Sequence, residues 1–218
     1  MAALSAPTTH YELFAGLRGA GVACLVTGST ALVLHGVPRL TPAVDLAVDP
    51  DPANLERLEL RLAAWGYQES GGAAHTAAGA TLRRFRHASA ALDEIEIVLP
   101  GMHEYARLRA GALVVTLVDV DIPVVGAADL CALKAGDGSA AGREDAAALE
   151  TLASVRADAA GDDTNTRREQ IRKFSRWSIA ARLDWLLAAA RLSKGLSPEA
   201  KPMTRGLIRR RGWTQRRG

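Results

Sequence analysis

The chain has 218 residues, enough for one domain of usual size with an extension or for two small ones. Its hydrophobic share of 48% is that of a globular protein with a real core, and no apolar run reaches the roughly 18 residues that span a bilayer. The two cysteines make no disulfide framework, and the N-terminus lacks a basic segment followed by a long apolar one. We therefore expect a soluble, cytoplasmic protein without a membrane partner.

The net charge of +3 hides an asymmetry along the chain. Residues 164–218 carry fifteen Lys or Arg against three acids, whereas the first 163 residues carry twelve bases against twenty-one acids. A basic C-terminal region on an acidic body is typical of a protein that binds a polyanion, or of a basic region that docks on its own body. The sequence leaves both alternatives open.

Hydrophobic periodicity predicts helices alternating with strands over most of the chain, which indicates an α/β fold. Helices are expected at 11–20, 30–35, 51–65, 104–109, 127–135 and 143–155. Strands are expected at 22–26, 44–48, 81–87, 94–99, 113–118 and 120–125. The Gly- and Ala-rich segment 70–80 predicts a loop, and 87–93 is short enough for a hairpin connection.

The C-terminal part of the chain has a different character. A run of small polar residues at 156–166 predicts a linker after a domain at 10–155. Residues 167–195 predict a basic amphipathic helix or helix pair, which either packs on a core or binds RNA or a partner protein. Its apolar stripe consists of Trp177, Ile179, Leu183, Leu186 and Leu187. Residues 196–218 lack periodicity and predict a disordered basic tail.

One segment near the N-terminus carries residue types suited to nucleotide chemistry. Gly28 and Ser29 follow a predicted strand and precede a helix, so backbone N–H groups and a hydroxyl can face phosphates there. Asp45 lies on the next strand and Glu96 on a later one, and carboxylates on adjacent strands suit Mg²⁺. Nucleotidyl transfer depends on such ions, which activate the attacking oxygen and neutralise phosphate charge.

The order of these residues resembles a known family. The run 26–46 reads Val-Thr-Gly-Ser-Thr-Ala-Leu-Val-Leu-His-Gly-Val-Pro-Arg-Leu-Thr-Pro-Ala-Val-Asp-Leu, and it is similar to the AbiEii-type and minimal nucleotidyltransferases of the DNA polymerase β superfamily. Further similar segments are Ile95-Glu96-Ile97-Val98, Ile122-Pro123-Val124-Val125 with Lys134, and Arg143-Glu144-Asp145. The resemblance covers about residues 11–155 and implies a polymerase-β-like nucleotidyltransferase core with a mixed sheet, followed by a C-terminal helical extension.

The resemblance also implies an activity and roles for individual residues. The activity is transfer of NMP from an NTP to an RNA, such as tRNA, or to a protein, with Mg²⁺ or alternatively Mn²⁺, often by the toxin of a toxin–antitoxin pair. The implied partners are an NTP, an RNA acceptor contacted by the basic tail, and a cognate antitoxin protein. Asp45 and Glu96 take the catalytic, metal-binding positions. The nucleotide-binding positions are Gly28, Ser29, Arg39 and Lys134.

The sequence departs from the family pattern at Ala43, where the first metal-binding aspartate is expected. Three explanations stay open: a natural pseudoenzyme, a shifted ligand set of Asp45, Glu94 and Glu96, or an active-site aspartate replaced in this chain. Glu94 and Glu96 can also be the solvated face of an edge strand, with Glu94 the more solvated of the two.

The other candidate residues have structural alternatives. Asp45 can cap a turn at the end of its strand, Ser29 can be a helix N-cap, and Arg39 can form a surface ion pair. Lys134 can be an ordinary helix lysine. Two rival functions follow: a catalytically inactive nucleotidyltransferase fold that binds nucleotide, RNA or a partner, and a DNA-binding regulator that uses the basic tail.

Overall fold

The computed structural model describes residues 4–76, 79–157 and 166–194. The helices are α1 (His10–Gly19), α2 (Gly28–His35), α3 (Pro52–Ala64), α4 (Met102–Ala110), α5 (Ala127–Gly136), α6 (Ala140–Ala157), α7 (Thr166–Ser175) and α8 (Ile179–Lys194). The strands are β1 (Cys24–Val26), β2 (Ala43–Val48), β3 (Gln68–Glu69), β4 (Ala74–His75), β5 (Thr81–Arg86), β6 (Glu94–Leu99), β7 (Leu113–Leu117) and β8 (Val120–Val124).

The strands form one mixed sheet in the order β3-β5-β6-β2-β1-β8-β7, with β4 paired to β5. The pairs β2–β6 and β1–β8 are parallel, whereas β1–β2 and the hairpins β5–β6 and β7–β8 are antiparallel. The expected α/β architecture with a mixed sheet is therefore confirmed. Because β6 lies between β5 and β2, the alternative that Glu94 and Glu96 belong to an edge strand is wrong.

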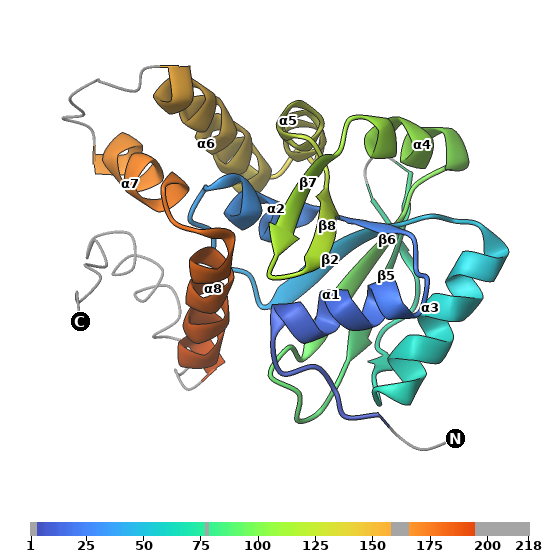
Figure 1. The fold of residues 1–218 in the computed structure, drawn as a ribbon. Helices are drawn as coiled ribbons and strands as arrows, with labels where there is room; N and C mark the ends of the chain where they lie inside the picture. The colour runs from blue at the N-terminus through green and yellow to red at the C-terminus, as the bar shows by residue number, and fades with distance from the viewer. Residues whose placement is uncertain (1–3, 77–78, 158–165, 195–218) are drawn as a thin grey trace.

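The two faces of the sheet have different neighbours. Cys24 and Val26 of β1 are in register with Val48 and Leu46 of β2, so Asp45 points to the opposite face because side chains alternate along a strand. Helix α1 borders the face of Cys24, whereas α2 packs over β2 on the face of Asp45. In Figure 1, α1 and α2 lie on different sides of the central strands.

Most boundaries agree with the sequence predictions, and two differences are informative. Helix α2 begins at Gly28, two residues earlier than expected, because Asp45 supplies the cap that its own N-cap residue, Thr27, does not. The predicted loop 70–80 contains β4, so that prediction was wrong over Ala74–His75. Strand β4 has only two residues with exposed side chains, and it therefore leaves no hydrophobic pattern in the sequence.

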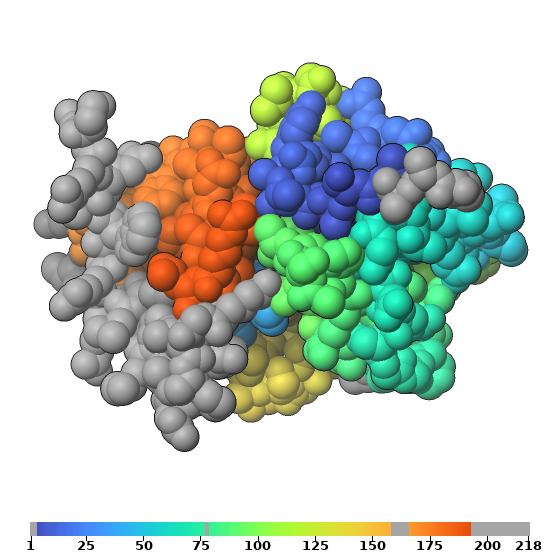
Figure 2. Space-filling view, turned by 90° about the horizontal axis from the view of Figure 1, so that it is seen from below, coloured from blue at the N-terminus to red at the C-terminus, as the bar shows by residue number. Residues whose placement is uncertain are grey.

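Helices α7 and α8 pack against the rest of the molecule (Figure 2), whereas polyanion binding by the basic region 164–218 stays a prediction. Leu183 and Leu187 join the main core, and Leu186 belongs to a second cluster with Phe174 and with Val33 of α2. Gly36, at φ +109°, allows this approach, since a Cβ there would lie 2.8 Å from Ser175 Cβ. The predicted linker residues 158–165 and the tail 195–218 lie outside the described residues.

Within the described part of the chain, no helix is long and apolar enough to cross a membrane.

Candidate functional site

The turn that opens α2 lies directly against Asp45. Gly28 has φ +57°, and a Cβ at this position would lie 2.5 Å from Asp45 Cγ and Oδ2. Glycine is therefore required at position 28 for two reasons: the left-handed backbone and the close approach of the Asp45 carboxyl group. Asp45 Oδ2 accepts hydrogen bonds from Ser29 N at 2.8 Å and from Thr30 N at 3.3 Å. The N-terminus of α2 is thus capped by a carboxyl group from another strand, and its first N–H groups point at an oxygen acceptor.

The carboxyl group of Asp45 is buried, with 9% of the residue exposed. Burial, and next the negative charge of Glu96, raise the pKa of Asp45 from 3.8 to about 7. The backbone N–H groups of Thr30 and Ser29 and the ammonium of Lys134 act in the opposite direction. Asp45 therefore carries a proton in a substantial fraction of molecules near neutral pH.

Two arginines on β5 pair with the two glutamates on β6. Arg84 is in register with Glu96, and its Nε lies 2.7 Å from Glu96 Oε1. Arg86 is in register with Glu94, and its Nη2 lies 2.8 Å from Glu94 Oε2. The expectation that Glu94 is solvated was wrong, because only 16% of its side chain is exposed.

These pairs continue onto β2. Glu96 is in register with Asp45, and Glu94 is in register with Ala43. Since paired residues on adjacent strands share a face, two rows cross the sheet. The acid row is Arg84–Glu96–Asp45, and the alanine row is Arg86–Glu94–Ala43.

The rows do not form the two-ion site that the resemblance to nucleotidyltransferases implies. Ala43 contributes no ligand, and both glutamates already have guanidinium partners. No three His, Cys, Asp or Glu residues among those described are grouped so that they could hold a metal ion. The shifted set Asp45, Glu94 and Glu96 fails for the same reason. Two oxygens, Asp45 Oδ1 and Glu96 Oε2, have no hydrogen-bond partner within the described chain.

The predicted nucleotide-binding cations are both held by one acid on α6. Arg39 Nε lies 3.1 Å from Asp145 Oδ1, and Lys134 Nζ lies 3.0 Å from Asp145 Oδ2. Asp145 is 3% exposed, so the two cations are fixed by a buried partner. The ion-pair alternative for Arg39 is therefore confirmed. Lys134 still influences Asp45 electrostatically, which places it beside the acid row.

The structure brings together Gly28, Ser29, Asp45, Glu96 and Lys134, and it connects Arg39 to them through Asp145. Their roles in binding or catalysis stay predictions. Two members of the site, Arg84 and Arg86, were not predicted from the sequence, and Asp145 was noted only within the family-like segment Arg143-Glu144-Asp145, without a role in the site. Arg84 and Arg86 have the same spacing of two residues as Glu94 and Glu96, and this matched alternation across a predicted hairpin was the available signal.

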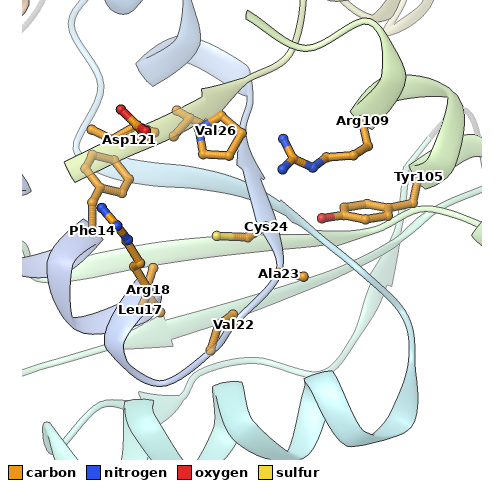
Figure 3. A pocket seen from close by; sticks show the side chains of 12 residues that line it. Phe14, Leu17, Arg18, Val22, Ala23, Cys24, Val26, Tyr105, Arg109 and Asp121 are labelled. Atoms are coloured by element: carbon orange, nitrogen blue, oxygen red, sulfur yellow. The ribbon is translucent and has the colours of Figure 1, made fainter. Parts of the chain in front are cut away.

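A cavity of about 180 Å³ lies on the other face of the sheet (Figure 3). Cys24 lies between Tyr105 and Arg109 of α4 on one side and Phe14 and Arg18 of α1 on the other. Burial raises the pKa of the Cys24 thiol to about 12, so the thiol stays protonated and is a poor nucleophile. Because this cavity is on the face away from Asp45, it is separate from the candidate site.

Comparisons with known proteins add structural neighbours. No known family and no curated protein matches the sequence. The lincosamide antibiotic adenylyltransferase LnuA, solved with lincomycin bound, is 15% identical over 66% of this chain and 97% of that chain, with a TM-score of 0.46. The antibiotic-resistance factor ANT(2'')-Ia is 12% identical over 90% of this chain and 95% of that chain, with a TM-score of 0.39.

A third neighbour is an antigenic nucleotidyltransferase-like protein from Paracoccidioides brasiliensis, 13% identical over 84% of this chain and 90% of that chain, with a TM-score of 0.38. Of the three neighbours, LnuA is an adenylyltransferase and the Paracoccidioides brasiliensis protein is nucleotidyltransferase-like. Since every TM-score is below 0.5, the function of this protein is inferred from its own residues. The narrower resemblance to AbiEii-type enzymes stays a prediction.

Proposed function

We propose that this protein is a nucleotide-binding module built on a nucleotidyltransferase-like fold, and that it takes the phosphates of an NTP at the N-terminus of α2 without transferring a nucleotide efficiently. The single observation that carries the proposal is the seating of the Asp45 carboxylate on the N–H groups of Ser29 and Thr30. That contact supports the proposal because the N–H groups of the turn point at an oxygen acceptor, as they would at a phosphate, and Lys134 adds a positive charge beside it.

The same surroundings argue against efficient transfer. Catalysis by two divalent ions requires several carboxylates that share the ions. In this chain Ala43 removes one carboxylate, Arg84 and Arg86 engage two others, and Asp45 is partly protonated near neutral pH. The turn at the N-terminus of α2 can still bind phosphate, but the side chains around it carry too little negative charge to attract a metal ion.

A second candidate function is the Mg²⁺-dependent transfer of NMP to an RNA or protein acceptor, as in a toxin with a cognate antitoxin. One observation favours it: Asp45 and Glu96 are in register on parallel strands beside the α2 turn. The basic tail beyond residue 194, which would contact an RNA acceptor, lies outside the described residues. The acceptor, the antitoxin partner and a cytoplasmic location stay predictions from the sequence.

The two candidates are separated by incubating the protein with labelled NTPs, Mg²⁺ and total tRNA, alongside equilibrium binding of the same NTPs. Three chains are compared: the native protein, Ala43→Asp and Asp45→Asn. The binding module predicts saturable nucleotide binding by the native chain and no labelled RNA or protein. Labelling by the native chain that is lost in Asp45→Asn would establish the second candidate instead. If no chain binds or transfers nucleotide, both candidates fail.

A further inference from the structure

The charges of the two rows balance without a metal ion. The acid row combines one guanidinium with Glu96 and Asp45, and the alanine row combines one guanidinium with Glu94. The two rows together therefore carry at most one net negative charge. A site for two divalent cations needs a larger excess of carboxylates, because such ions are bound by charged oxygen ligands. Ala43 in place of the expected aspartate and the two arginines thus have the same effect: each reduces the negative charge that two divalent cations would need.

The two guanidinium groups are accessible to a ligand. The side chains of Arg84 and Arg86 are 44% and 62% exposed, whereas their glutamate partners are 25% and 16% exposed. Arg84 uses its Nε for Glu96, and within the described residues neither of its Nη atoms has a hydrogen-bond partner. These N–H groups are free to bind a phosphate, which a guanidinium fork matches in shape.

The arginines also lie within reach of the α2 turn. Neighbouring strands are about 4.8 Å apart, so β5 lies about 10 Å from β2 across β6. The Arg84 side chain extends over β6 toward Asp45, because its Nε contacts Glu96. A chain of phosphates that takes the place of the Asp45 carboxyl at the N–H groups of Ser29 and Thr30 has Arg84 on its β5 side, and Arg86 lies two residues further along the same face of β5.

We propose that Arg84 and Arg86 replace the metal ions of the site, so that the protein binds the polyphosphate of its nucleotide directly and without a divalent cation. This inference rests on the nucleotide-binding function proposed above and adds its mode of phosphate recognition. The glutamates hold the two guanidinium groups in place when no nucleotide is bound. On binding, phosphate oxygens take up the free N–H groups of Arg84.

The test is calorimetric titration of the full chain with ATP, GTP, CTP and UTP, in EDTA and again in excess Mg²⁺. The variants Arg84→Gln and Arg86→Gln each remove one guanidinium group. A third variant, Arg84→Lys, keeps the positive charge but lacks the paired N–H donors of the guanidinium group. Arg83→Gln is the matched control, because Arg83 is on the same strand but faces the other side, where it pairs with Glu59 and Glu69. Circular dichroism and thermal melting verify that each variant is folded.

We expect the preferred nucleotide to bind with similar affinity in both buffers. We expect Arg84→Gln to weaken that binding about 10-fold or more, since a hydrogen bond to a charged group contributes roughly 1.5–3 kcal/mol. Arg86→Gln should weaken it less, Arg84→Lys should restore part of it, and Arg83→Gln should leave it unchanged.

Two results would overturn the inference. Binding that is lost in EDTA would mean that a divalent ion, and not an arginine, holds the phosphates, although the proposed nucleotide-binding function would survive. Equal affinities of Arg84→Gln and Arg83→Gln would mean that the guanidinium groups on β5 only stabilise the sheet. Absence of nucleotide binding in both buffers would instead refute the proposed function itself.

Discussion

Both ends of α2 are held by charged side chains from other elements, yet the two ends differ in what surrounds them. At the N-terminal end, Asp45 accepts hydrogen bonds from the first N–H groups. At the C-terminal end, Arg182 Nη1 donates to Leu34 O at 2.7 Å, and Arg156 Nη2 donates to His35 O at 2.7 Å. Each charge has the sign that complements the helix dipole at its end.

Asp45 and Arg182 are about equally buried, at 9% and 7% exposed, so the difference lies in the neighbours of each group. Arg182 is 7% exposed and is enclosed by carbonyl groups, including Ser175 O, to which it also donates. The network around Asp45 instead continues through Glu96 to the exposed Arg84. Similar helix contacts can therefore serve different purposes: the C-terminal end anchors α2, and on the function proposed above the N-terminal end faces the nucleotide.

The largest expected effect is at the anchored end. Arg182→Met removes donors to two carbonyls and leaves both without a partner, so it should lower the free energy of unfolding by about 3 kcal/mol. Urea denaturation followed by circular dichroism measures this loss. Arg191→Met on the exposed face of α8 is the control and should stay within about 0.5 kcal/mol of the native chain. Equal stabilities of the two variants would mean that α8 does not anchor α2.

A smaller effect is expected at the Gly28 turn. Gly28→Ala combines a left-handed backbone with a clash against the Asp45 carboxylate, and should cost between about 2 and 3 kcal/mol. Gly71→Ala is the matched control, because Gly71 has φ +74° but a Cβ there would meet no atom within 4 Å. It should cost only about 1 kcal/mol. If the two variants are equally stable, the close packing of Asp45 on this turn contributes nothing.

Asp45, at the N-terminal end of α2, should also make the stability of the protein depend on pH. A native pKa of about 7 for Asp45, against 3.8 when unfolded, means that the folded protein binds more protons between these values. Stability contributed by this group is therefore present at low pH and lost as pH rises through the native pKa. In the native chain we expect the free energy of unfolding to fall by about 2 kcal/mol between roughly pH 4.5 and 6.5. Asp45→Asn should not show this fall, because asparagine does not titrate.

Urea denaturation at several pH values measures that decline in the native chain and in Asp45→Asn. Asparagine retains an oxygen that can accept from Ser29 and Thr30, so the variant isolates the titration from the capping contact. Identical pH profiles would show that Asp45 is already ionised in the folded protein at low pH, as an ordinary exposed aspartate is.

The smallest effect should come from restoring the missing acid. Ala43→Asp places a buried carboxylate in register with Glu94 and should destabilise the metal-free protein by about 1 kcal/mol. Excess Mg²⁺ should reverse this loss by mass action and raise the melting temperature of the variant alone. Ala43→Asn, which has nearly the same shape without the charge, should not respond to Mg²⁺. A response by the native chain would contradict the charge balance of its two rows.

The elements that have a local signal could be predicted from the sequence. Helix α3 follows from Leu58 and Leu62 at helical spacing, which the sequence displays directly. The resemblance to nucleotidyltransferases implied that Gly28, Asp45 and Glu96 lie in one site, and the structure brings the three together.

Contacts between distant elements could not be predicted in this way. Lys134 meets the buried Asp145 because α5 and α6 pack together, and Arg39 reaches the same acid from the segment between α2 and β2; spacing along the chain encodes neither contact. The rows on the sheet depend on the register of β5 with β6, and a slip by one residue would turn Arg84 to the other face. The family pattern specifies carboxylates, and it contains no counterpart of the arginines that pair with them in this chain.

The hydrogen bond between Arg182 and Leu34 also has a consequence for biosynthesis. It joins positions 148 residues apart, and Arg182 belongs to the last helix described. A ribosome releases the chain from its N-terminus, so α2 and the Asp45 turn emerge long before their anchor does. The nascent protein therefore acquires a fixed α2 turn only after α8 has left the ribosome, and a chain truncated before α8 should form its sheet while leaving α2 loosely attached.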